Sequence, residues 1–128
     1  MAEVTRTYEL PYPPSVNHYW RHVGWRTLIS REGRRYRKEV VALLAAQRAR
    51  SMNGRLVVRV TVHPPDVRRR DLDNVQKALF DALQQGGALH DDSQIDELVI
   101  KRGAVVPDGK TIVEITEIDA NGTASVPT

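Results

Sequence analysis

The sequence contains no cysteine, which excludes disulfide bonds, thiolate metal sites and cysteine nucleophiles. Aromatic residues are scarce, at 5% of the chain, and no apolar run approaches the roughly 20 residues that cross a bilayer. The first residues, MAEVTRTYELPYPP, lack the basic start and apolar stretch of a secretory signal. Together these absences predict a cytoplasmic protein with no membrane partner.

The 128 residues, 41% hydrophobic and 27% charged, suffice for one folded domain and are too few for two. We expect this domain to occupy residues 1–118. Residues 119–128 are small, polar and turn-forming, and they are expected to form a flexible C-terminal tail.

The charged residues are unevenly distributed along the chain, although the net charge is only +3. Residues 1–70 contain 15 Lys and Arg against 5 Asp and Glu, whereas residues 71–128 contain 4 against 11. A polyanion-binding surface beside a metal or acid–base site would account for this separation. A fold that intermixes both halves into a patchwork surface is equally open.

Periodicity predicts an α+β domain, a mixed sheet with packed helices, in the order strand, helix, strand, helix, hairpin. The expected strands are 5–10, 56–63, 97–106 and 110–118, the helices are 30–47 and from 71 or 73 to 86, and a loop covers 20–29. The turn signal Pro107-Asp108-Gly109 favours a hairpin between the last two strands.

The strongest chemical signal is the segment 66–77, DVRRRDLDNVQK, where three arginines precede two carboxylates. If Asp71 is extended before the first helical turn, Asp71 and Asp73 can point to the same side. Lys77 follows Asp73 by one helical turn. The alternative is structural: a helix cap, a partner for the helix dipole and a surface ion pair.

A second acidic pair, Asp91 and Asp92, follows the Gly-Gly stop of that helix. Adjacent carboxylates repel each other, which is unfavourable in a crowded site unless a cation lies between them. Asp71, Asp73 and one member of this pair would supply the oxygen ligands that Mg²⁺ takes beside waters and a phosphate. The pattern favours hard-metal phosphate chemistry, and a solvated acidic loop remains the alternative.

Arginines and tryptophans in two segments are candidates for contact with DNA. The arginines that can pair with phosphates are Arg68, Arg69, Arg70, Arg21 and Arg26. Trp20 and Trp25 can stack on unpaired bases, or can instead cover the core.

These motifs, taken in order, resemble the RusA family of Holliday junction resolvases. The matching segments are 11–17 (PYPPSVN), 19–22 (YWRH), 26–30 (RTLIS), 65–78 (PDVRRRDLDNVQKA), 80–83 (FDAL), 91–94 (DDSQ) and 116–117 (TE). They span about residues 6–118. The loop 23–25, the stretch 86–90 and the tail depart from the family pattern.

The resemblance implies a homodimer that cuts four-way junction DNA by paired symmetric nicks. It implies Mg²⁺ as cofactor, for which Mn²⁺ can substitute, and no small-molecule cofactor. The implied catalytic residues are Asp71, Asp73, Asp92 and Lys77, and the implied metal ligands are the three aspartates with support from Asp91. The resemblance places Arg70 and Asn74 beside the site. Together with Arg68, Arg69, Arg21, Arg26 and Trp25, whose chemistry is described above, they are the expected DNA contacts.

Two other functions stay open at this point. One is a branched-DNA-binding module without catalysis, and the other is a nuclease of the same fold that acts on flaps or other branches. Four-way junction, flap, fork and plain duplex, each tested with and without Mg²⁺, distinguish them.

Overall fold

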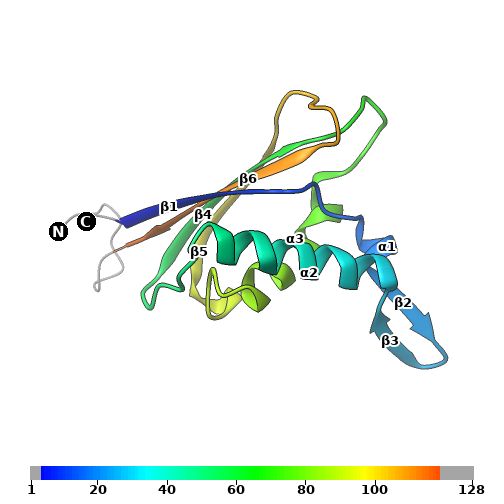
Figure 1. Cartoon of the computed structure of the whole chain (residues 1–128), viewed down its shortest axis with the longest axis horizontal. Coiled ribbons are helices and arrows are strands. Elements are labelled where there is room, and N and C mark those ends of the chain that lie inside the picture. The colour runs from blue at the N-terminus through cyan, green and yellow to red at the C-terminus, as the bar shows by residue number, and fades with distance from the viewer. Residues whose placement is uncertain (1–3, 119–128) are drawn as a thin grey trace.

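The computed structural model describes residues 4–118 (Figure 1), so the tail expected at 119–128 lies outside the described residues. Its elements are β1 (Val4–Leu10), α1 (Val16–Tyr19), β2 (Trp20–Val23), β3 (Arg26–Ile29), α2 (Arg31–Ala46), β4 (Leu56–His63), the 3₁₀ turn η1 (Leu72–Val75), α3 (Gln76–Gln85), the 3₁₀ turn η2 (Asp92–Gln94), β5 (Ile95–Arg102) and β6 (Lys110–Glu117). Within residues 4–118, no helix combines the length and apolarity needed to cross a membrane.

The α+β class is confirmed: two helices pack on a mixed four-stranded sheet of order β1-β6-β4-β5. Strand β6 runs antiparallel to both β1 and β4, whereas β4 and β5 are parallel. A parallel pair needs a crossover connection, and the segment containing η1, α3 and η2 supplies it. This crossover carries most of the acidic residues that the sequence singled out.

The prediction that the last two strands form a hairpin is wrong, because β4 lies between β5 and β6. The predicted turn does form: Asp108 and Gly109 have φ of 68° and 72°, and the Gly109 N–H donates to the Val106 carbonyl at 2.8 Å. It belongs to a longer connection, 103–109, that crosses two strand spacings, about 10 Å. Strand β5 also ends at Arg102, four residues earlier than expected.

A second correction concerns residues 20–29, which form a two-stranded hairpin and not the expected loop. Gly24 and Trp25 connect its strands, and Gly24 has a φ of 59°. The hairpin escaped prediction because its side chains are mostly exposed and so show no apolar alternation. It projects from the domain at the end opposite to the start of β1 (Figure 1).

The core lies between the sheet and the two long helices. Alternate residues of β4, from Leu56 to Val62, are at most 1% exposed and face α2 and α3. The period of two residues predicts this alternation. Helix α2 contributes Val40 and Leu44, and α3 contributes Leu79 and Leu83. Each fully buried leucine stabilises the fold by about 1.5–3 kcal/mol. This packing holds α3 rigidly, with its other face turned to solvent.

Candidate active site

A cleft of about 560 Å³ runs along the exposed face of α3. Its lining residues from η1 and α3 recur at helical spacing, and they are Asp73, Gln76, Lys77, Phe80, Asp81 and Gln84. Because residues three and four positions apart share one face of a helix, the amino-acid spacing places these groups in one row. Trp20 from β2 and Asp92 from η2 complete the lining.

Three of the predicted catalytic residues therefore meet in this cleft: Asp73, Lys77 and Asp92. Burial raises the pKa of Asp92, and the carboxylate of Asp91 raises it further, while the Lys77 ammonium lowers it. A smaller upward contribution comes from Asp81. The cleft thus concentrates negative charge around one lysine.

Asp71, the fourth predicted residue, lines a neighbouring hollow that also contains Asn74, His18 and the arginines at 68–70. Its backbone is extended, with φ of −94° and ψ of 139°, immediately before η1. Asp71 is thus extended before the first turn, as the sequence analysis supposed, but it lines this neighbouring hollow whereas Asp73 lines the cleft. In residues 4–118, no group of three or more His, Asp or Glu side chains is close enough to hold a metal ion.

Asp91 caps η2 and does not line the cleft. Its carboxylate accepts from the Ser93 N–H at 3.3 Å, while the Gln94 side-chain oxygen accepts from the Asp91 N–H at 3.1 Å. This reciprocal pair is a capping box. The two adjacent aspartates therefore differ: Asp91 organises the turn, and Asp92 is presented to the cleft.

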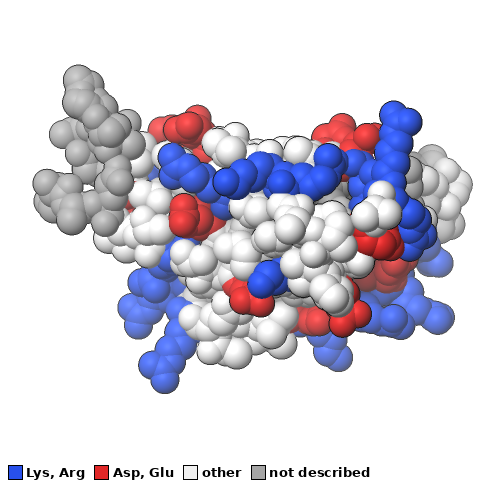
Figure 2. Space-filling model, turned by 90° about the horizontal axis from the view of Figure 1, so that it is seen from above, with Lys and Arg blue, Asp and Glu red and all other residues white. Residues whose placement is uncertain are grey.

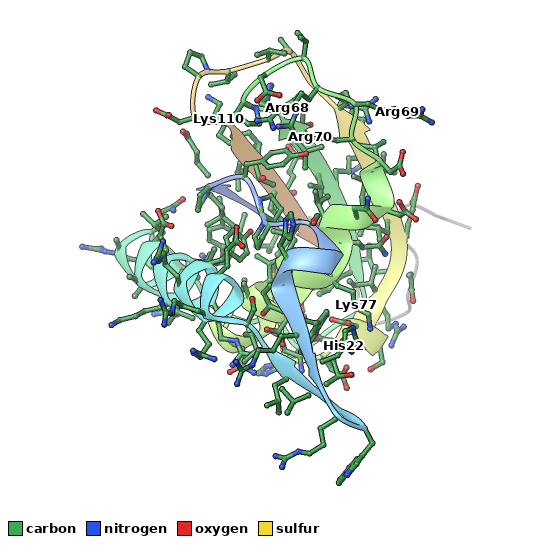
Figure 3. All side chains as sticks on the ribbon, turned by 90° about the vertical axis from the view of Figure 1, so that its right-hand side faces the viewer. His22, Arg68, Arg69, Arg70, Lys77 and Lys110 are labelled. Atoms are coloured by element: carbon green, nitrogen blue, oxygen red, sulfur yellow. The ribbon has the colours of Figure 1, made fainter. Side chains whose placement is uncertain are left out.

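The arginines of the 66–70 loop also differ from one another. Asp66 accepts from Arg70 at 2.6 Å and from Arg68 at 2.9 Å, and these hydrogen bonds hold the pKa of Asp66 well below its usual range. Arg70 also lies over the Tyr12 ring, with its Cζ 5.8 Å from the centroid. Arg69 is exposed, takes part in no ion pair within residues 4–118, and points away from the other two (Figure 3).

A contact that the sequence analysis did not identify joins three elements at the end of the cleft. The buried Tyr19 hydroxyl donates to Asp81 Oδ2, and Arg37 donates to the same oxygen through Nε at 3.0 Å and Nη2 at 2.8 Å. Burial and then the hydrogen bond to Asp81 raise the pKa of Tyr19 to about 12. The signals in the sequence were the position of Asp81 one helical turn after Lys77 and the presence of Tyr19 and Asp81 in two of the segments that resemble the family, 19–22 and 80–83.

The remaining candidates for DNA contact lie on the β2–β3 hairpin. Arg21 and Arg26 are exposed, and Trp25 at the tip is 92% exposed, with the Arg26 Cζ 5.9 Å from its ring centroid. Trp20 at the hairpin base contributes to the cleft wall. The hairpin therefore connects the acidic cleft to a basic, aromatic tip.

On the face seen in Figure 2, the charge separation along the chain does not become a separation on the surface. Figure 2 shows basic and acidic side chains interspersed over one face of the molecule. The patchwork alternative therefore describes this face, because the fold pairs strands and helices from both halves of the chain.

The donor set of the cleft fits a hard divalent cation. Asp81 accepts hydrogen bonds from Tyr19 and Arg37, which leaves Asp73 and Asp92 as the two other carboxylates of the cleft. Mg²⁺ is usually bound through one or two carboxylates together with waters and a phosphate. Other carboxylates crowd Asp92, and a bound cation would relieve the repulsion between them.

Residues 11–116 match the family model described as Endodeoxyribonuclease RusA. The chain is 42% identical over 112 residues to the crossover junction endodeoxyribonuclease rusA of Enterobacteria phage HK97, covering 87% of this chain and 93% of that protein. It is 40% identical over 115 residues to the RusA protein of Escherichia coli K12, covering 89% and 96%. For the protein of Enterobacteria phage 82 the identity is 41% over 110 residues, covering 85% and 92%.

Proposed function

Because this chain belongs to the endodeoxyribonuclease RusA family, we propose that it resolves four-way DNA junctions by hydrolysis in the cleft that contains Asp73, Lys77 and Asp92. By homology it is a crossover junction endodeoxyribonuclease, a hydrolase of DNA recombination and repair. The observation that carries the proposal is that Asp73, Asp92 and Lys77 line the same cleft. A DNA substrate also fits the cytoplasmic location expected from the sequence.

Asp73 and Asp92 would hold Mg²⁺, or Mn²⁺ in its place. When bound, the ion supplies Lewis-acid stabilisation of negative charge on a phosphate oxygen. Lys77 would place its ammonium beside the same phosphate, where charge develops during in-line displacement. Asp71 stays in the proposed set of catalytic residues. Because it lies in the adjacent hollow with Asn74 and Arg69, the Asp71→Asn variant tests its role separately.

The arginine loop and the hairpin would hold the DNA on either side of this cleft. Arg69 is free for a phosphate, whereas Arg68 and Arg70 are engaged by Asp66. Phosphate contacts position the DNA without reading its sequence. The arrangement therefore supports recognition of branched structure more than recognition of base sequence.

The test separates binding from cleavage with Asp73→Asn, Asp92→Asn and Asp71→Asn. Each substitution keeps side-chain volume but removes a negative charge facing DNA, so junction binding in Ca²⁺ should be kept or tightened. Nicking in Mg²⁺ should fall by about 100-fold or more, as expected when a group that stabilises transition-state charge is lost. The measurements are a gel-shift titration, a nicking time course and a melting curve.

Asp108→Asn is the matched control, because Asp108 sits in an exposed turn at φ 68°, a conformation that asparagine tolerates. It should nick like the unmodified protein. Near-normal nicking by any of the three test variants removes that residue from the site. A lower melting temperature with cleavage retained would instead indicate a structural ion-pair role.

Lys77→Ala should abolish cutting while largely keeping binding. Lys77→Arg should restore little, because a planar guanidinium does not replace a compact ammonium at close range. Running the substrate panel of four-way junction, flap, fork and duplex on the unmodified protein tests the remaining alternative. Faster cutting of flaps than of junctions would overturn the proposed substrate.

A further inference from the structure

The tip of the β2–β3 hairpin exposes an indole ring that the fold does not use. Trp25 is 92% exposed, and the hairpin carries it away from the domain (Figures 1 and 3). An exposed aromatic ring on a projecting element is available to stack on a flat partner. The Arg26 guanidinium lies over one face of the ring.

The base of this hairpin is held firmly, in contrast to its tip. The Ser30 N–H donates to the Tyr19 carbonyl at 2.8 Å, and the Ser30 hydroxyl donates to the His18 carbonyl at 2.6 Å. The Tyr19 ring is fully buried and meets Trp20 edge-on, with centroids 4.9 Å apart. Gly33 allows the start of α2 to lie close to the Tyr19 backbone, since a Cβ at position 33 would be 2.5 Å from the Tyr19 carbonyl oxygen.

The anchor also sets the position of the hairpin relative to the cleft. Tyr19 donates to Asp81, which lines the cleft one helical turn after Lys77. Strand β2 rises about 3.3 Å per residue from Trp20 in the cleft wall to Val23, and Trp25 lies about one step further in the turn, so the tip lies roughly 13 Å from the wall. That distance corresponds to about four nucleotide steps along one DNA strand.

The charges around the tip indicate what it meets. The hairpin, residues 20–29, contains two arginines and no aspartate or glutamate. In a symmetric contact between two copies, this positive segment would face itself, which is unfavourable. A flat aromatic beside guanidinium groups matches a nucleotide, whose base stacks while its phosphate pairs with arginine.

We propose that the β2–β3 hairpin is an arm that stacks Trp25 on the base face that the branch of the substrate leaves unstacked, with Arg21 and Arg26 on the flanking phosphates. This inference rests on the proposed function. Within a plain duplex both faces of each base are covered by its neighbours, so the arm gains its stacking contact only where the branch exposes a base. It therefore discriminates branched DNA from duplex.

The test compares Trp25→Ala and Trp25→Phe for binding to a four-way junction and to a duplex in Ca²⁺. Loss of one base–aromatic stack should weaken junction binding about 5- to 150-fold, with the phenylalanine variant in between. Duplex affinity should change less than twofold. Val4→Ala removes an apolar side chain, 46% exposed, at the opposite end of the molecule and should change neither affinity.

Fluorescence gives an independent measurement, because the chain has two tryptophans and only Trp25 is nearly fully exposed. Acrylamide should quench this accessible component in the free protein. Junction DNA should protect it, and duplex should not. The same component should be missing from Trp25→Ala.

The outcomes of these experiments distinguish a failure of the proposed arm from a failure of the proposed function. Unchanged junction affinity in Trp25→Ala, or a Trp25 that stays accessible to acrylamide in the complex, overturns the arm while leaving the nuclease proposal intact. A shift of Trp25→Ala from dimer to monomer in light scattering also overturns it, by making the tip a contact between copies. If the unmodified protein shows no preference for junction over duplex, the proposed function fails as well.

Discussion

The adjacent residues Asp91 and Asp92 have different roles, one structural and the other in the cleft. Asp91 uses its carboxylate to cap η2, and Asp92 lines the cleft beside Lys77. We expect Asp91→Asn to keep both fold and nicking, because asparagine caps as well as aspartate does. Asp91→Ala should lower the free energy of unfolding by about 1 kcal/mol.

Melting curves and nicking time courses of Asp91→Asn, Asp91→Ala and Asp92→Asn check this expectation side by side. Asp92→Asn should melt normally and fail to nick. A loss of nicking in Asp91→Asn equal to that in Asp92→Asn would show that Asp91 is itself a ligand, as the family resemblance allows.

Arg69 and Arg70 are adjacent but differ in what they contact. Arg70 bridges to Asp66 and lies over Tyr12, whereas Arg69 is exposed and engaged in no ion pair within 4–118. Arg69→Ala should weaken binding to all junction sequences alike and lower the slope of log affinity against log salt by about one unit. Arg70→Ala should lower the melting temperature.

Salt titrations of junction binding in Ca²⁺ measure the first effect, and thermal melts measure the second. An unchanged salt slope in Arg69→Ala, together with a reduced slope in Arg70→Ala, would reverse the two roles. Arg70 would then leave Asp66 when DNA binds.

Among the structural elements, the loop between β4 and η1 depends on one ionised side chain. Hydrogen bonds from Arg70 and Arg68 lower the pKa of Asp66 from its usual 3.8. A carboxylate whose pKa is lower in the folded than in the unfolded chain stabilises the fold at pH values above about 4. That stabilisation is lost as the pH falls from there towards the pKa of the folded state.

Asp66→Asn should therefore melt below the unmodified protein at neutral pH, and the difference should shrink between pH 5 and pH 3. Asp108→Asn, at a carboxylate that has no ion pair in residues 4–118, should show no such pH-dependent difference. A constant deficit for Asp66→Asn across pH 3–7 would mean that the carboxylate charge is not what holds the loop.

At the scale of the whole assembly, we expect two chains to bind one four-way junction. One chain of 14.5 kDa carries one copy of the proposed catalytic cleft, and paired symmetric nicks need two sites on two equivalent strands. A two-fold dimer satisfies this requirement with identical surfaces on both copies. Sedimentation or light scattering should show a mass of about two chains at concentrations where nicking is complete, and a fully active monomer would contradict the dimer.

Much of the fold and part of the site follow from local patterns. The alternation Leu56, Val58, Val60, Val62 correctly predicts β4, and Ser30 correctly predicts the start of α2, where it caps the Gly33 N–H at 2.9 Å. The helical spacing of Asp73 and Lys77 correctly places both on one face. These features depend only on the periods of 2 and 3.6 residues, which the sequence displays directly.

Other features depend on contacts between residues far apart in the chain. The place of β6 between β1 and β4, the separate hollow of Asp71, and the contact of Tyr19 with Asp81, 62 positions away, belong to this group. Periodicity shows which face of an element is apolar, but several partners of similar apolar character can cover that face. Which partner does so is decided when all strands and helices pack into one core, where most buried backbone N–H and C=O groups are hydrogen-bonded and the side chains fill the space closely.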